Sequence, residues 1–102
     1  HRITLLHASR TPADFPLKAD FEQLAGDNLK FTYVSIADSA PDDWRGERGG
    51  IDAEMVKKYV SNLRQPIYYL CGPQGMVRAM RRLLVGLKVN EDNIRTEEFA
   101  GY

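Results

Sequence analysis

Strand-like apolar segments alternate with helix-like segments along this chain, and that alternation is its strongest constraint on the fold. The strand-like segments are rich in β-branched and aromatic residues; they cover 3–9, 29–37, 67–71 and the stretch from residue 94 onward. The helix-like segments carry apolar residues at helical spacing and cover 14–26, 51–63 and 74–87. Strands that alternate with helices predict an α/β domain with a mostly parallel sheet and right-handed crossovers, layered between helices.

Two segments carry more specific expectations. Residues 67–71, "IYYLC", are apolar at every position, which is typical of a central parallel strand that is covered on both faces. Residues 38–50 form a polar, Gly-rich stretch around the single Trp44 and show neither a helix nor a strand period. This stretch is therefore predicted to be a loop, in which Trp44 either covers a ligand or anchors the loop.

Size and composition describe one ordinary globular domain, and we expect residues 1–102 to form it without an internal boundary. Fourteen basic and fourteen acidic residues cancel, so bulk charge gives no reason to expect nucleic-acid or membrane-surface binding. No apolar run approaches the roughly 20 residues of a membrane-spanning helix. The single cysteine rules out an internal disulfide, and with only two histidines we expect no metal site and a reducing, cytoplasmic setting.

The ends of the predicted strands carry the candidate ligand-binding residues. Ligands of open parallel sheets bind outside the carboxyl ends of the strands. The residues at those ends are Ser9, Arg10, Ser35, Asp38, Gly72 and Pro73. Gly72 lacks a Cβ, so a ligand could approach its backbone closely, and the free N–H groups of the helix that starts near Gln74 favour an anion such as a pyrophosphate. The pattern indicates a nucleotide site, although Gly-Pro is also an ordinary turn.

Cys71 invites a catalytic interpretation that its neighbours do not support. A cysteine phosphatase would need an arginine at position 77, where the chain has Val77; Arg78 lies about 100° further around a helix. A Cys-His hydrolase is equally disfavoured, because His1 is terminal and His7 lies within an apolar strand, where a core histidine is expected. We therefore expect no covalent chemistry at Cys71.

The sequence resembles a known family along nearly its whole length. The segments that carry the likeness are "ITLLHASRTPADF", "VSIADSAPDDWRGERGGID", "YYLCGPQGM" and the closing "EEFAGY". In this order they resemble the pyridine-nucleotide domain of the ferredoxin-NADP reductase family, which includes phthalate and benzoate dioxygenase reductases. The resemblance implies a Rossmann-like domain for hydride transfer from NAD(P)H to FAD or FMN, with electrons passed on to an iron–sulfur or haem partner.

The resemblance also implies roles for individual residues. Cys71 would lie beside the nicotinamide ring and orient it without forming a bond to it, while Gly72 and Pro73 would line the cofactor path. Met76 ends the motif and would pack beneath it, or simply belong to the core. Phe99 and Tyr102 match the family's C-terminal aromatic residues, which lie beside the flavin.

The choice of cofactor can be partly inferred from the same resemblance. NADPH-dependent members often carry Ser-Arg-Glu after the strand that corresponds to 29–37, and the arginine binds the 2′-phosphate. This chain has Ser35 to Asp38 in that region, where Ile36 offers no charge and Asp38 suits a ribose hydroxyl. Arg10 and Arg48 remain possible phosphate partners, but NADH is favoured over NADPH.

Two parts of the family pattern are missing. No G-x-G-x-T-P turn is present, so the domain lacks the family's first strand, and the flavin-binding domain is absent too. We therefore expect a fragment of a longer reductase that is inactive by itself, with the flavin-binding domain in the same parent chain. Because the missing strand would lie mid-sheet, either the first strand here pairs across the gap, or a partner chain fills it by dimerisation or strand exchange. The alternative is a non-catalytic interaction module that has lost nucleotide binding.

Overall fold

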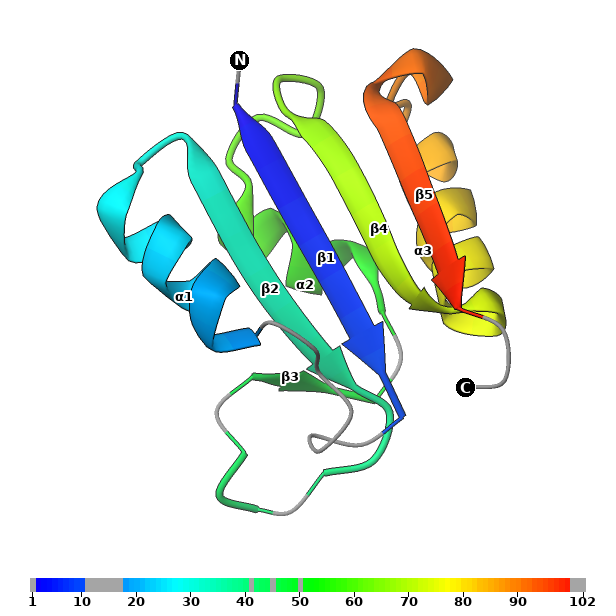
Figure 1. The fold of residues 1–102 in the computed structure, drawn as a ribbon. Helices are drawn as coiled ribbons and strands as arrows, with labels where there is room; N and C mark the ends of the chain where they lie inside the picture. Colours follow the sequence, from blue (N-terminus) through cyan, green and yellow to red (C-terminus); the bar gives the residue numbers. More distant parts are fainter. Residues whose placement is uncertain (1, 11–17, 41, 45, 50, 100–102) are drawn as a thin grey trace.

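The computed structural model describes residues 2–10, 18–40, 42–44, 46–49 and 51–99, and its centre is a five-stranded parallel sheet in the order β3-β2-β1-β4-β5 (Figure 1). The strands are β1 Ile3–Ser9, β2 Phe31–Ala37, β3 Glu47–Arg48, β4 Ile67–Pro73 and β5 Ile94–Phe99. The helices are α1 Lys18–Asp27, α2 Ala53–Tyr59 and α3 Gln74–Gly86, with a short 3₁₀ turn at Glu91–Asn93. The predicted α/β class and parallel sheet are confirmed.

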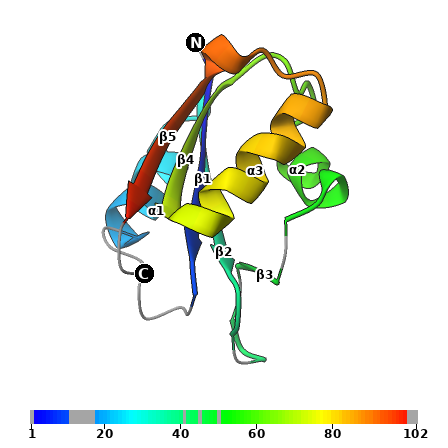
Figure 2. The ribbon, with the colours of Figure 1, turned by 90° about the vertical axis from the view of Figure 1, so that its right-hand side faces the viewer.

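The rear face of the sheet holds the hydrophobic core. Side chains alternate between the faces of a strand, and the even-numbered residues of β1, β2 and β4 point toward α2 and α3 (Figure 2). Tyr68 is fully buried there, and its hydroxyl donates a 2.7 Å hydrogen bond to the Leu63 carbonyl. The other central members of this core are Leu6, Val34, Ile36, Leu70, Val56, Val77, Met80 and Leu84.

The front face of the sheet is covered only in part. Helix α1 lies on this side next to β2 (Figures 1 and 2), where Phe21 stacks on Tyr33 with ring centroids 5.5 Å apart. Over β4 and β5 the described residues provide no helix, and Tyr69 is 44% exposed. The expectation that residues 67–71 are covered on both faces is therefore wrong for the front face in the described part of the chain.

Strands β1 and β4 pair directly with each other, in register from Ile3↔Ile67 to His7↔Cys71. The first of the two alternatives for the missing strand is thus the one found here. Gly72 makes the close pairing possible, because a Cβ on it would lie 2.4 Å from the Ala8 carbonyl oxygen. Its φ of 144° is also one that residues with a side chain rarely adopt.

Element boundaries depart from the sequence prediction in three places. The helix predicted for 51–63 ends at Tyr59, because Val60 adopts an extended conformation, although Val60 itself stays buried. At its other end Asp52 caps α2 by accepting a 2.8 Å hydrogen bond from the Met55 N–H. The predicted loop 38–50 contains the two-residue strand β3, which pairs with Ile36 and Ala37. The strand predicted for 29–37 begins only at Phe31.

Candidate functional site

The carboxyl ends of β1, β2 and β4 meet at one edge of the sheet, at the bottom of Figure 1. Backbone hydrogen bonds continue the pairing past the strands, from the Asp38 N–H to the Ser9 carbonyl and from the Ser39 N–H to the Arg10 carbonyl, both 2.9 Å. Ser9 therefore lies next to the end of β2, with Arg10 and Asp38 exposed around it. This edge is where the sequence predicted a ligand.

Ser9 has the most unusual environment among the predicted site residues. Its side chain is fully buried, yet its Oγ has no hydrogen-bond partner among the described residues. A buried hydroxyl without a partner costs roughly 1–3 kcal/mol, so such groups in native proteins usually have a reason to be retained. A bound polar group that hydrogen-bonds Ser9 would remove this cost, so Ser9 fits a nucleotide ligand.

The start of α3 offers backbone donors close to this edge. Pro73 is the N-cap residue and makes no side-chain capping hydrogen bond to the first turn. The N–H groups there lack the usual side-chain acceptor, and the positive end of the helix dipole favours an anion. The proposed ligand access at Gly72 needs a correction, however. The space where its Cβ would lie is filled by Ala8 of β1, so on that side the glycine serves strand packing and not a ligand.

Cys71 lies partly buried in a row of polar side chains that crosses the sheet. The strand registers place Ser35, His7, Cys71 and Glu97 side by side on β2, β1, β4 and β5. Burial, and then the negative charge of Glu97, raise the pKa of the Cys71 thiol. Both effects disfavour the thiolate that a nucleophile requires. The thiol is therefore suited to packing and not to covalent attack, in line with the sequence interpretation.

His7 behaves as the core histidine that the sequence indicated. It is 1% exposed, its Nδ1 lies 2.8 Å from the Tyr33 hydroxyl, and its ring meets Phe21 edge-on with centroids 5.9 Å apart. Burial lowers the pKa of His7 to about 4. The imidazole is thus neutral near pH 7 and already has a hydrogen-bond partner.

The remaining predicted residues do not share one pocket. Asp38 and Met76 line a small cavity of about 80 Å³ between the sheet and α3, which we call the rear cavity. Met76 also packs against the core, in agreement with the simpler of its two interpretations. Cys71 lines a separate front groove of about 400 Å³, together with Leu5, Phe21 and Tyr69. The described residues therefore hold pieces of a dinucleotide site but no single cleft.

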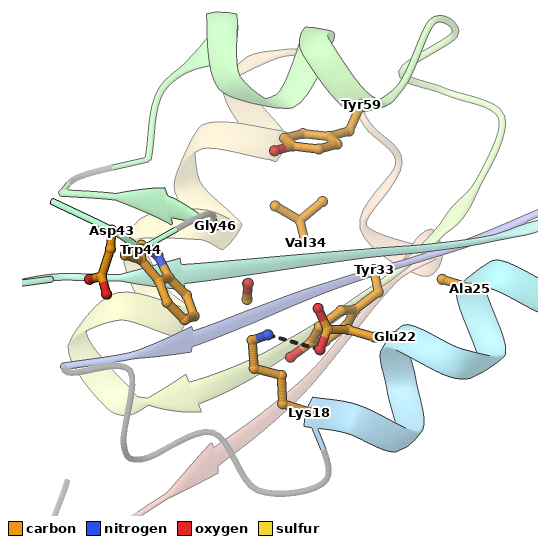
Figure 3. A pocket seen from close by; sticks show the side chains of 10 residues that line it. Lys18, Glu22, Ala25, Tyr33, Val34, Asp43, Trp44, Gly46 and Tyr59 are labelled. Atoms are coloured by element: carbon orange, nitrogen blue, oxygen red, sulfur yellow. Dashed lines mark ion pairs between the residues drawn. The ribbon is translucent and has the colours of Figure 1, made fainter. Parts of the chain in front are cut away.

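Ser35 lines a third hollow of about 520 Å³, the edge pocket between α1, β2 and the Trp44 loop (Figure 3). The dashed line in Figure 3 marks the 2.9 Å ion pair of Lys18 with Glu22, and Lys18 also lies 5.2 Å from the Trp44 ring centroid. The Trp44 Nε1–H donates to the Glu47 carbonyl, 3.0 Å away. These contacts favour the loop-anchoring interpretation of Trp44.

Two predicted residues and one missed residue lie on the C-terminal segment. Strand β5 ends at Phe99, whose backbone is in register with Pro73, while Tyr102 lies outside the described residues. Glu97 was not singled out from the sequence, although the register places it next to Cys71. The alternation of side chains along the last strand was the signal available, but pairing partners only follow from the strand order.

Metal binding and membrane insertion find no support in the described part of the chain. No group of three or more His, Cys, Asp or Glu side chains in it is arranged to hold a metal ion. Within the same ranges no helix combines the length and apolar character needed to cross a membrane.

Comparison with solved structures identifies the fold. The cytochrome b5 reductase domain of Ulva prolifera nitrate reductase superimposes with a TM-score of 0.74 over 94% of this chain and 48% of that chain, at 18% identity. The ferredoxin reductase in carbazole 1,9a-dioxygenase gives a TM-score of 0.63 over 97% of this chain and 30% of that chain, at 29% identity. The first of these likenesses concerns the fold alone, because its identity is low.

Sequence comparison identifies the family. One of the polypeptides of the Na⁺-translocating NADH-quinone reductase from Serratia proteamaculans is 32% identical over 105 residues, and its counterpart from Haemophilus influenzae is 30% identical. Both alignments cover 98% of this chain but 26% of the relative, so the chain spans about a quarter of the length of these relatives. The oxidoreductase NAD-binding domain pattern matches residues 1–82, and the chain therefore belongs to the oxidoreductase NAD-binding domain family.

Proposed function

We propose that this chain is the NAD(P)H-binding half of a flavin-dependent electron-transfer reductase. The observation that carries the proposal is the fully buried, unpartnered Ser9 hydroxyl at the carboxyl edge of a sheet of this family. When bound, the reduced nicotinamide supplies a hydride to FAD or FMN held by a flavin-binding domain of the same longer polypeptide. An iron–sulfur or haem protein is the proposed final acceptor.

The residues of this chain would bind and orient the cofactor. Ser9 gains the hydrogen bond that it lacks, and the uncapped first turn of α3 provides donors for a phosphate. Cys71, kept as a neutral thiol by burial and by Glu97, packs without competing chemistry. Positioning of this kind, by itself, can contribute several kcal/mol to a transfer step. In this proposal Phe99 and Tyr102 belong to the flavin side.

NADH is the proposed cofactor in preference to NADPH. Ile36 is buried and uncharged, and Asp38 is exposed at the strand end, where a carboxylate repels a 2′-phosphate and accepts a hydrogen bond from a ribose hydroxyl. The relatives of the quinone reductase type carry NADH in their names, which supports the same choice. Arg10 is exposed and would be the competing phosphate partner.

Within the proposal, residues 1–102 are only part of a nucleotide-binding domain. Support comes from the length of the relatives, of which this chain spans about a quarter. The direct pairing of β1 with β4 points the same way, because it closes the middle of the sheet and leaves the predicted site residues in separate hollows. Binding by the isolated chain is accordingly expected to be weak and turnover absent.

Titration of the isotope-labelled chain with NADH and NADPH tests the proposal. NADH should shift amide signals of Ala8 to Arg10 and of Cys71 to Met76, more strongly than NADPH does. Ser9→Ala should weaken these shifts, whereas Ser61→Ala, at an exposed serine of a turn, should leave them unchanged. Shifts confined to other regions, or equal shifts in both variants, would contradict the proposed site.

The second candidate is an interaction module on the same fold that no longer binds nucleotides. The separation of Cys71 from Asp38 and Met76 into two hollows favours it. This candidate predicts no response to either nucleotide, in the 102-residue chain or in a longer polypeptide that contains it.

A further inference from the structure

The front face of the sheet presents an apolar groove next to α1. It is lined by Leu5, Phe21, Phe31, Tyr69, Arg95 and Glu97, among others, and has a volume of about 400 Å³. The rear face is covered by α2 and α3, whereas in the described part of the chain α1 is the only helix in front (Figure 2). We call this groove and the exposed surface of β4 and β5 around it the open face.

The open face has the properties of an unfilled layer. All-parallel sheets occur almost only with both faces covered, because their strands are apolar on both sides. Tyr69 is 44% exposed at the centre of this face, and α1 itself has no buried residue. An apolar groove without a cluster of like charges suits a protein surface better than an anion.

The charges on the open face restrict which protein surface can cover it. Arg95 and Glu97 are two residues apart on β5, so their side chains share one face of the strand. Both are exposed, and Arg95 already donates a hydrogen bond to the Asp92 carbonyl. A covering surface must offer an acid to Arg95 and a base to Glu97, because an unpaired buried charge is costly.

A second copy of this chain meets both requirements. In a two-fold symmetric contact, residue i of one copy meets residue j of the other, and j meets i. Arg95 of each copy can then pair with Glu97 of the other while the two Tyr69 regions exclude water. The formal net charge of zero means that two copies do not repel each other as wholes.

We propose that two copies of this chain associate through the open face, with Tyr69 at the centre and reciprocal Arg95–Glu97 pairs beside it. This inference does not depend on nucleotide binding. It assigns to the front face a role that the proposed cofactor site does not explain.

Sedimentation equilibrium over a series of concentrations tests the central contact. The unaltered chain should approach twice its mass of 11.6 kDa as the concentration rises. Tyr69→Glu should remain a monomer over the same range. Val85→Glu is the matched control, because Val85 is 40% exposed on α3, at the opposite side of the sheet; it should dimerise like the unaltered chain.

Charge exchange tests the proposed pairing. Arg95→Glu or Glu97→Arg alone should raise the dissociation constant of the dimer by about tenfold or more, because like charges then face each other. The double exchange Arg95→Glu with Glu97→Arg should restore it. An equimolar mixture of the two single variants should also associate, because each supplies the charges that the other needs, and this recovery separates a pairing effect from lost folding.

Several results would overturn the inference. An unaltered chain that stays monomeric at every concentration, with an open face that binds a hydrophobic dye, would show that another polypeptide covers this face. Equal association of the Tyr69→Glu and Val85→Glu variants would place any dimer contact elsewhere. Failure of the mixed single variants to associate, with the double exchange equally weak, would refute the Arg95–Glu97 pairing.

Discussion

Replacement of Gly72 by alanine tests the least expected feature of this fold, the direct pairing of β1 with β4. A Cβ at position 72 would lie 2.4 Å from the Ala8 carbonyl oxygen and 3.0 Å from the Ala8 carbonyl carbon. Both atoms belong to the backbone of a central strand, so a side-chain rotation cannot relieve the contact. The φ of 144° adds a second obstacle, because residues with a side chain rarely adopt it.

The two obstacles allow the loss of stability to be estimated. A residue with a side chain in such a backbone conformation costs about 1–3 kcal/mol. Forcing one additional carbon into a close-packed region costs roughly another 1–3 kcal/mol. Gly72→Ala should therefore lower the free energy of unfolding by about 2–6 kcal/mol, against a total of about 5–15 kcal/mol for a domain of ordinary stability.

Urea unfolding, followed by far-UV circular dichroism and by the fluorescence of the single tryptophan, measures this loss. Gly75→Ala is the matched control, since position 75 lies in α3 and an added Cβ there meets nothing within 4 Å. That variant should gain up to about 1 kcal/mol, because alanine favours a helix. A second change, Ala8→Gly, should not rescue Gly72→Ala, because the closest atom is a carbonyl oxygen.

A Gly72→Ala variant that is as stable as the unaltered chain would refute the reasoning. It would mean that β1 and β4 are not in contact at Ala8, as expected if another strand separated them. A loss as large in Gly75→Ala would instead show that α3, and not the pairing of β1 with β4, is sensitive to the added carbon.

Three further predictions concern stability and reactivity. Because burial lowers the pKa of His7 to about 4 from an ordinary 6.5, the unfolded chain binds this proton more readily, so stability present above pH 6.5 should fall by about 3 kcal/mol as the pH drops toward 4; urea midpoints should show this loss, and His7→Gln should make them less pH-dependent. Asp52→Ala removes the cap on the Met55 N–H and should cost about 1 kcal/mol in urea unfolding, whereas an equal loss in Asp52→Asn would argue against capping. Cys71 should react with iodoacetamide more slowly in the folded chain than after unfolding, and Glu97→Gln should accelerate the reaction by removing the charge that raises the thiol pKa; reaction at the unfolded rate would contradict its burial.

The periodicity of the sequence predicted the order of the elements correctly, because periods of two and 3.6 residues are local properties of a chain. Strand β1 was predicted with its observed bounds, and α3 to within one residue of its end. The early end of α2 at Tyr59 was not predictable in this way, since Val60 and Leu63 still pack on the core after the helix has stopped. Apolar spacing thus revealed which residues face inward but not where the backbone leaves the helix.

The candidate site was predictable only in part, for a similar reason. The sequence indicated which residues end each strand, and the parallel sheet places those ends at one edge. It did not reveal that Ala8 fills the space beside Gly72, or that Glu97 lies beside Cys71, because both depend on which strands are neighbours. The exposure of Tyr69 escaped prediction as well, since "IYYLC" carries no sign of which face remains uncovered.

The sequence by itself determined the α/β class, the parallel sheet and the family of this chain, since these follow from local periodicity and from ordered motifs. Only the tertiary structure decided that β1 and β4 adjoin, that the predicted site residues lie in separate hollows, and that one face of the sheet stays open. The physical reason is that strand neighbours and layer cover depend on contacts between distant segments. A strand pairs with whichever edge is available to it, and its own residues record the faces it offers but not the partner that fills them.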